Sequence, residues 1–311
     1  MSGAASPLAI EAAGLRFQNP VMLASGTAAY GRELAGVTDL NRLGGIVTKA
    51  VSVELRSGAP APRVAEWSGG MVNAVGLANP GVDRVRSEEL PWIAANVRGP
   101  RVLANVVGRA VEDFASVVGS LDGEAALDGF ELNVSCPNVR AGGLEFGADE
   151  SSLRAVVSGC RAATRKPLFV KLSPTLPDIA AAARTAVDAG ADGITLVNTL
   201  PGLVIDVATR RPALGFGSGG VSGQGLLPVG VLATAKVRKA VAVPLIGVGG
   251  VASCEDALQY MIAGASLVGI GTAALRDPRL PERIARDLAR WCERNNLRSI
   301  AELVGTLEWP A

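Results

Sequence analysis

The chain contains no histidine among its 311 residues. Histidine is the usual general base near neutral pH, so its absence excludes Ser-His-Asp and Cys-His catalysis and His-containing metal sites. Proton transfer must then come from a cysteine, a lysine, a carboxylate or a bound cofactor. Cys136 is the best candidate base, because polar residues surround it, a proline follows it, and a free thiol has a pKa of about 8.5.

The other three cysteines, Cys160, Cys254 and Cys292, lie in helical sequence patterns. All four cysteines are far apart and form no C-x-x-C pair, so we expect reduced thiols rather than a disulfide framework or a zinc site. In helical patterns a cysteine usually acts as a small core residue. We therefore predict no metal site and assign these three cysteines to the core.

Polar residues end several apolar segments of the sequence. They are Ser25, Lys49, Asn105, Asn133, Lys171 and Asn198, and Asn73 and Asn138 follow in connecting segments. Taken singly, such an asparagine satisfies a turn and such a lysine extends into solvent. Taken together, amides offer the donors and acceptors that a planar heterocycle needs, and two lysines suit an anionic ligand or developing negative charge.

Two glycine segments indicate phosphate binding. They are Gly247-Val-Gly-Gly250 and Gly269-Ile-Gly-Thr272, each at the end of a predicted strand. Glycine lets backbone N–H groups approach a phosphate, and barrels often bind phosphate after strands seven and eight. Tight turns alone also require glycine, which is the simpler explanation for either segment by itself.

Eight short apolar runs must position these residues. They are Val21–Ser25, Gly45–Val51, Val102–Val107, Phe130–Ser135, Leu168–Ser173, Gly193–Asn198, Leu245–Val248 and Leu267–Ile270. Helical patterns separate most of them, with capped examples at Asp149–Thr164, Asp178–Ala189 and Ser253–Ala263. This alternation predicts an α/β fold, a (β/α)8 TIM barrel forming a single domain over residues 1–311, with an open doubly wound sheet as the alternative.

Three connections are longer than a barrel requires, and all leave the carboxyl ends of strands. They follow strand two (Ser52 to about Pro80), strand four (Pro137–Gly147) and strand six (Leu200–Gly225). Active sites of barrels lie at that end, so function is expected there. The segment Leu8–Phe17 predicts a small N-terminal hairpin at the opposite end.

The charge balance and the hydrophobic content of the chain indicate which kinds of partner it can bind. The chain carries 30 basic and 29 acidic residues, so no field of one sign points to nucleic acid or an acidic membrane. Its N-terminus does not read as a signal peptide, and no apolar run reaches 18 residues. We expect a cytoplasmic protein with no membrane segment. Because 49% of the residues are hydrophobic and only 19% are charged, part of the surface is expected to contact another subunit.

The segment Glu131-Leu-Asn-Val-Ser-Cys-Pro-Asn138 resembles the active-site segment of class 1 dihydroorotate dehydrogenases, FMN-dependent barrels of pyrimidine biosynthesis. The resemblance covers nearly the whole chain. It recurs in order at Ala24-Ser-Gly-Thr27, Thr48-Lys-Ala50, Asn73-Ala-Val-Gly-Leu77, Ala104-Asn-Val-Val-Gly108, Val170-Lys-Leu-Ser-Pro174, Val197-Asn-Thr199, Gly219-Gly-Val-Ser-Gly223, Gly247-Val-Gly-Gly250 and Gly271-Thr272.

The segments Asn73–Gly81 and Ala104–Gly108 are most similar to those of the class 1B catalytic subunit. That class implies a homodimer joined by an iron–sulfur subunit that carries FAD and a [2Fe-2S] cluster, in a heterotetramer that passes electrons to NAD. The chain has no closely spaced set of four cysteines for such a cluster. It departs from the family at Ala28-Ala29, where phenylalanine is usual, and at Gln224-Gly225, where Pro-Ala is usual.

Carried over residue by residue, the resemblance implies two sets of contacts. FMN would be held by Ser25, Lys49, Ala50, Asn105, Asn133, Lys171, Val197 and Gly223, with its phosphate on Gly249, Gly250, Gly271 and Thr272. Dihydroorotate would contact Lys49, Asn73, Ala74, Val75, Gly76, Leu77, Asn133, Asn198 and Thr199. Cys136 would remove a C5 proton while hydride leaves C6 for flavin N5, and Lys171 would stabilise charge on the reduced flavin.

Other functions fit parts of this pattern. A dihydropyrimidine dehydrogenase-like subunit would keep the barrel and FMN but take a pyrimidine without a carboxylate. A class 1A enzyme would pass its electrons to fumarate. A phosphate-binding scaffold without catalysis would leave Cys136 and the asparagine set without a role.

Overall fold

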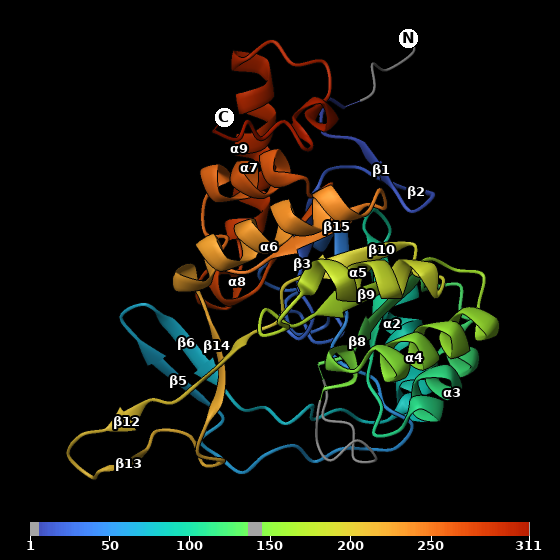
Figure 1. The fold of residues 1–311 in the computed structure, drawn as a ribbon, viewed down its shortest axis with the longest axis vertical. Helices are drawn as coiled ribbons and strands as arrows, with labels where there is room; N and C mark the ends of the chain where they lie inside the picture. Colours follow the sequence, from blue (N-terminus) through green and yellow to red (C-terminus); the bar gives the residue numbers. More distant parts are fainter. Residues whose placement is uncertain (1–5, 136–144, 311) are drawn as a thin grey trace.

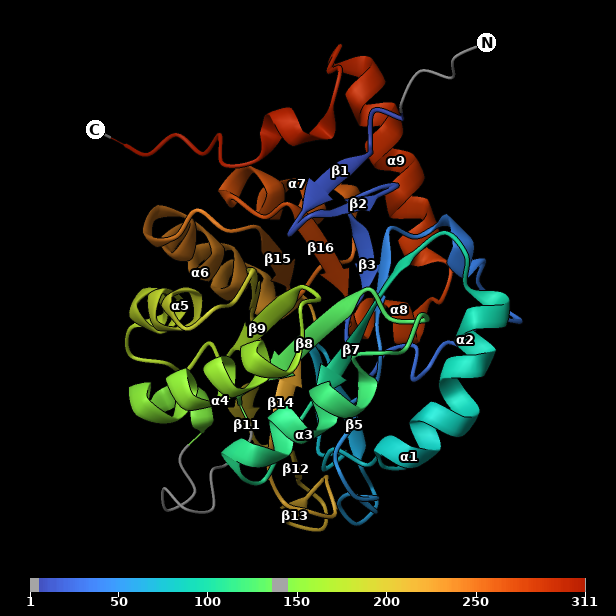
Figure 2. The ribbon, with the colours of Figure 1, turned by 90° about the vertical axis from the view of Figure 1, so that its right-hand side faces the viewer.

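A computed structural model describes residues 6–135 and 145–310. Eight parallel strands close into a barrel, as predicted (Figures 1 and 2). Around the barrel they are β3 (Val21–Leu23), β4 (Gly45–Val47), β7 (Arg101–Val106), β8 (Gly129–Asn133), β9 (Leu168–Leu172), β10 (Gly193–Leu196), β15 (Leu245–Val248) and β16 (Leu267–Ile270). The (β/α)8 prediction is confirmed, and the open sheet is excluded because β16 pairs with β3.

Helices surround the barrel. They are α1 (Val82–Arg84), α2 (Leu90–Asn96), α3 (Val111–Leu121), α4 (Glu150–Ala163), α5 (Ile179–Asp188), α6 (Leu227–Ala240), α7 (Cys254–Ala263), α8 (Thr272–Arg276) and α9 (Leu280–Arg294). A π-helical turn at Val85–Glu89 joins α1 to α2, and short 3-10 turns lie at Leu40–Arg42, Phe146–Ala148, Gln224–Leu226 and Ile300–Leu303. Within the described residues, none of the helices has the length and apolarity needed to span a bilayer.

Side-chain caps fix the helix starts that the sequence predicts. Asp149, Asp178 and Ser253 each accept a hydrogen bond from a backbone N–H in the first turn of α4, α5 and α7. Such caps satisfy donors that a helix leaves unpaired. Of the three cysteines assigned to the core, Cys160 and Cys292 are buried. Cys254, the first residue of α7, is half-buried and packs against the edge of the same core.

The two ends of the barrel carry different additions. Strands β1 (Ile10–Ala12) and β2 (Leu15–Phe17) form the predicted N-terminal hairpin, which lies beside the amino ends of the strands in Figure 2. The connections after β4 and β10 lie at the opposite end, where the strands finish. The fold therefore separates a covered amino end from an elaborated carboxyl end.

Two of the long connections build a second sheet. Its antiparallel order is β11 (Leu200–Gly202), β14 (Gly219–Ser222), β6 (Gly70–Asn73) and β5 (Val64–Trp67). Strand β6 comes from the connection after β4, and β14 from the connection after β10, with Asn73 opposite Gly220. The sequence did not predict this sheet, because its strands are short and pair across 147 residues.

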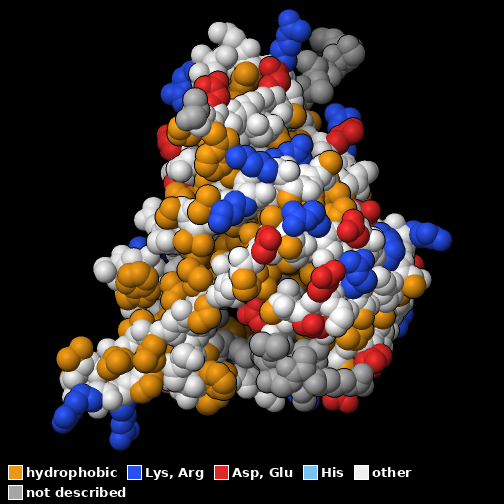
Figure 3. All heavy atoms as spheres, in the orientation of Figure 1, with side chains coloured by type: hydrophobic (Ala, Val, Ile, Leu, Met, Phe, Trp, Pro, Cys, Tyr) orange, Lys and Arg blue, Asp and Glu red, His pale blue; other side chains and the backbone are white. Residues whose placement is uncertain are grey.

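A hairpin extends from this sheet. Strands β12 (Ile205–Asp206) and β13 (Arg211–Pro212) form the arm that projects at the lower left of Figure 1. Figure 3 shows hydrophobic side chains on the same arm, and Ile205, Val207 and Phe216 are 54%, 85% and 67% exposed.

The barrel interior packs large side chains against glycines. A Cβ added to Gly193 would lie 2.3 Å from Phe169 Cε1 and 3.0 Å from the Pro244 carbonyl oxygen. Phe169 is fully buried and lies opposite Gly193 in the register of β9 and β10. Close packing of this kind leaves no space for an added methyl group.

We predict that Gly193→Ala lowers the free energy of unfolding by about 1–3 kcal/mol, because the new methyl group overpacks the barrel interior. Gly159→Ala is the matched control in α4, where the new Cβ meets only Ala115 Cβ at 3.7 Å. It should raise stability by about 0.5–1 kcal/mol through the helix preference for alanine. Urea unfolding of both variants tests this, and a Gly193→Ala protein as stable as the wild type would contradict it.

Candidate active site

A lysine lies inside the barrel near its carboxyl end. The Lys171 side chain on β9 is 7% exposed, and its Nζ donates to Ser25 Oγ at 3.3 Å. The same Nζ lies 3.9 Å from Glu131 Oε1 on β8. The predicted site residues Ser25 and Lys171 therefore contact each other. Lys171 does not extend into solvent, which was the simpler interpretation of a lysine at a strand end.

Glu131 is a member of this site to which the sequence analysis gave no role. It is 1% exposed, and its Oε1 accepts a hydrogen bond from Asn105 Nδ2 at 2.8 Å. Asn105 lies opposite Glu131 in the register of β7 and β8, and its backbone N–H donates to Thr48 Oγ1 at 3.2 Å. The available signal was a charged residue inside a continuous apolar run, which is almost never fully buried without a partner.

A second group of amides lies beside the first. Asn198 Nδ2 donates to Asn133 Oδ1 at 3.2 Å, and Asn198 Oδ1 accepts from the Thr199 backbone N–H at 2.9 Å. Asn133 lies opposite Lys171 in the register of β8 and β9. Strand register and these contacts bring Asn105, Asn133, Asn198 and Lys171 together at one end of the barrel.

The segment Asn73–Leu77 leaves the second sheet. Asn73 Nδ2 donates to the Gly220 carbonyl at 3.2 Å, which fixes the side chain on β14. The backbone of Ala74 donates to Arg63, and that of Val75 accepts from Ala59, so the turn is anchored to the preceding connection. Gly76 and Leu77 both have positive φ, which makes this turn sharp.

The predicted phosphate residues lie just after β15, at Gly249 and Gly250, and at the start of α8, at Gly271 and Thr272. Thr272 Oγ1 donates to Ser222 Oγ at 2.8 Å, joining the segment after β16 to the end of β14. Gly223, the residue after Ser222, has a φ of 105°, a conformation that favours glycine. A Cβ on Gly250 would lie 2.5 Å from the backbone nitrogen of Leu227, the first residue of α6. The glycine segments after β15 and β16 therefore lie close to the end of β14 and to the start of α6.

Other predicted contacts are fixed by their backbones. Lys49 N–H donates to the Ala29 carbonyl at 2.7 Å, and the Ala50 carbonyl accepts from Tyr30 Oη at 3.1 Å. Burial raises the pKa of Tyr30, so its phenol remains a donor. Val197 N–H donates to the Val248 carbonyl at 2.9 Å.

The residues that depart from the family lie next to these contacts. Ala28 is fully buried and Ala29 has positive φ, so the loop after β3 packs with small side chains. Gln224-Gly225 opens the 3-10 turn that leads into α6, where both residues are exposed.

Cys136 and Asn138 lie outside the described residues. Ser135 is the last residue described before them, and its backbone N–H donates to Asn133 Oδ1 at 3.4 Å. In the described part of the chain, no three His, Cys, Asp or Glu side chains are grouped as metal ligands.

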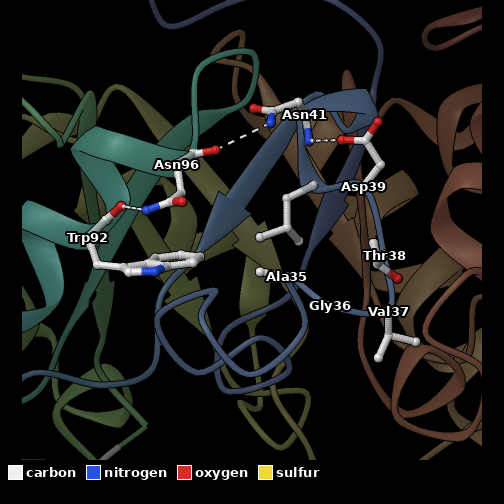
Figure 4. A pocket seen from close by; sticks show the side chains of 9 residues that line it. Ala35, Gly36, Val37, Thr38, Asp39, Asn41, Trp92 and Asn96 are labelled. Atoms are coloured by element: carbon white, nitrogen blue, oxygen red, sulfur yellow. Dashed lines mark hydrogen bonds between the residues drawn. The ribbon is translucent and has the colours of Figure 1, made fainter.

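A pocket of about 360 Å³ lies elsewhere, between residues 35–41 and the end of α2 (Figure 4). These segments lead into the amino ends of β4 and β7, away from the site described above. Its amides are engaged within the protein: Asn41 Nδ2 donates to the Asn96 carbonyl, and Asn96 Nδ2 donates to the Trp92 carbonyl. The amide groups of both asparagines therefore stabilise the backbone that lines this pocket.

The sequence matches the family model described as dihydroorotate dehydrogenase over residues 7–291. The chain belongs to the dihydroorotate dehydrogenase family. The class 1 resemblance and the prediction of an oxidoreductase are thereby confirmed, and membership implies a flavin cofactor.

Three relatives illustrate the similarity. One from Pelobacter propionicus is 44% identical over 97% of this chain and 98% of its own length, and one from Geobacter sp. strain M21 is 42% identical over the same shares. Both are named dihydroorotate dehydrogenase B (NAD(+)), catalytic subunit, which supports class 1B. One from Solibacter usitatus, 46% identical over 97% of this chain and 99% of its own, carries the provisional name dihydroorotate dehydrogenase A (fumarate).

We predict that Asn105→Leu lowers the free energy of unfolding by about 1–3 kcal/mol, because it removes a hydrogen bond to a buried carboxylate. Asn198→Leu is the control, since Asn198 is only half-buried and its uncharged partner Asn133 keeps the hydrogen bond from the Ser135 N–H, and it should cost less than about 1 kcal/mol. Urea unfolding without ligand compares the two. Equal losses would contradict a buried charge at Glu131.

Proposed function

We propose that the chain is the single-domain catalytic unit of an FMN-dependent dihydroorotate dehydrogenase, which oxidises (S)-dihydroorotate to orotate in pyrimidine biosynthesis. The observation that carries the proposal is the buried Lys171 ammonium, held between Ser25 and Glu131 beside the Asn133–Asn198 amide pair. An ammonium and amides at one barrel mouth suit a heterocycle that gains negative charge.

The residues present fit FMN at both ends. Glycine is required at Gly223, where a Cβ would lie 2.6 Å from Gly70 Cα, and at Gly250, where it would meet Leu227. FMN would contact Gly223, and its phosphate would be held by Gly249, Gly250, Gly271 and Thr272. Ser25, Lys49, Ala50, Asn105, Asn133, Lys171 and Val197 would hold the ring system.

When bound, FMN supplies the acceptor for a hydride from C6 of dihydroorotate. The chain supplies the other steps. Cys136 accepts the C5 proton as general base, so that loss of one proton and one hydride leaves the C5=C6 double bond of orotate. Lys171 stabilises negative charge as the flavin is reduced.

Substrate recognition falls to the residues around the Asn133–Asn198 pair. These amides, with Lys49, Thr199 and the turn Asn73–Leu77, would bind the pyrimidine edge and its carboxylate. The turn is anchored through Asn73 to β14, and Gly223 directly follows that strand, which supports the proposal that substrate and cofactor contacts share this sheet.

The electrons, we propose, pass to NAD through an iron–sulfur subunit carrying FAD and a [2Fe-2S] cluster, in a heterotetramer built on a homodimer. The catalytic-subunit names of the Pelobacter and Geobacter relatives support this. The exposed apolar side chains of the β12–β13 arm are consistent with a covered surface. The second candidate is a class 1A enzyme that passes its electrons to fumarate, because the Solibacter relative is named for that acceptor.

An anaerobic absorbance titration of the FMN-loaded chain with dihydroorotate tests the function. We expect rapid loss of the flavin absorbance band, because reduction removes it, and reoxidation by fumarate or by NAD with a partner then identifies the acceptor. Bound FMN that stays oxidised with dihydroorotate but bleaches with dihydrouracil would support the dihydropyrimidine alternative. A chain that binds no flavin would contradict the enzyme assignment.

We predict that Cys136→Ala retains FMN and loses turnover by about 10²–10⁴-fold, because the chain has no histidine to take over the proton. Steady-state rates and the absorbance of the bound flavin give the two readouts. Cys160→Ala in α4 is the control for loss of a thiol, and its turnover should not change. A loss below about tenfold for Cys136→Ala would argue against the general base.

A further inference from the structure

Glu131 is a carboxylate inside the barrel that the proposed mechanism does not use. It is 1% exposed, and the fully buried Phe130 and Leu132 flank it on β8. Its Oε1 takes a hydrogen bond from Asn105 and lies 3.9 Å from Lys171 Nζ. Removing a carboxylate from water is unfavourable unless such partners compensate it.

Stability alone is a weak reason for this pair. Replacing a buried ion pair by apolar residues of similar volume is often neutral or stabilising. Both partners of Glu131, however, are residues proposed to contact FMN. A change in the charge at Glu131 therefore reaches the cofactor site through Lys171 and Asn105.

The geometry of Asn105 adds a second effect. An ionised carboxylate only accepts hydrogen bonds, so the Asn105 amide must turn its NH₂ toward Glu131. Its Oδ1 consequently faces away from Glu131 and can accept from a ligand donor. Glutamine at position 131 could donate or accept, and it would no longer fix that orientation.

We propose that Glu131 is a positioning residue and the counter-charge of Lys171, and that it lowers the affinity of the site for reduced relative to oxidised FMN. Lys171 favours the extra negative charge of reduced flavin, and the Glu131 carboxylate opposes part of that field. The pair holds the potential of the flavin below the value that Lys171 alone would give. The proposal rests on the proposed function, since it requires bound FMN.

The test compares the wild type with Glu131→Gln, Glu131→Asp and Thr195→Val, each loaded with FMN and reduced anaerobically against a reference dye. Glu131→Gln should raise the ratio of reduced to oxidised FMN affinity about tenfold, or about 30 mV for two electrons. Lys171→Ala should lower the ratio. Glu131→Asp keeps the charge and should remain close to the wild type.

Thr195→Val is the matched control. Thr195 lies opposite Lys171 in the register of β9 and β10, is fully buried, and has a hydroxyl without a hydrogen-bond partner in the described part of the chain. Its isosteric replacement changes the same layer of the barrel without changing charge, so the potential should not move. A shift in Thr195→Val or in Glu131→Asp equal to that in Glu131→Gln would overturn the proposal.

If the Glu131→Gln protein does not fold, a second pair of variants tests the same proposal. Lys171→Met leaves the Glu131 carboxylate without its ammonium, and adding Glu131→Met removes both charges. The double variant should bind reduced FMN about tenfold better than Lys171→Met and melt at a higher temperature. No gain over Lys171→Met would overturn the proposal.

The outcomes separate this inference from the function. If FMN has the same midpoint potential in the wild type and in Glu131→Gln, only the proposed role of Glu131 is overturned. A chain that takes up no FMN, measured by quenching of flavin fluorescence, overturns the proposed function and this inference with it.

Discussion

Polar groups inside a closed barrel must pair with one another or with a ligand, because water cannot reach them. Lys171 and Glu131 lie in the barrel interior and partner each other, and Asn105 completes the carboxylate's contacts. Toward the mouth, the buried Asn133 pairs with Asn198, which is half-exposed. The polar groups thus pass from a charge pair inside the barrel to a neutral amide pair near its carboxyl end.

The second sheet lies at the carboxyl end of the barrel, next to these residues. Its strands come from two connections that leave opposite sides of the barrel, after β4 and after β10, and their pairing holds Asn73 and Gly223 on one support. Loops that pair in a sheet place their side chains more firmly than separate loops would. The hydrogen bond from Thr272 to Ser222 then joins this sheet to the end of the barrel's last strand.

The barrel could be predicted because each strand is a local apolar run, ended by a polar residue or by glycine, and each cap is a local contact. The convergence of Asn105, Asn133, Asn198 and Lys171 followed, since parallel strands end at one mouth. The sheet from β5, β6, β11 and β14 depends on pairing between distant segments, which local patterns do not encode. Glu131 was missed for a related reason: its partners lie on β7 and β9, and only the strand register brings them to it.

The pairing of β6 with β14 also limits how the two connections can vary in length. A shift of one residue in β6 would turn Asn73 to the other face of the sheet, and a shift in β14 would move the segment leading to Gly223. Insertions at the tip of the β12–β13 arm would leave that register unchanged, whereas the stretch before β5 is itself bonded to Ala74, Val75 and Asn79. Natural and engineered variation in loop length should therefore be confined to the tip of the arm, while the paired strands keep a constant number of residues.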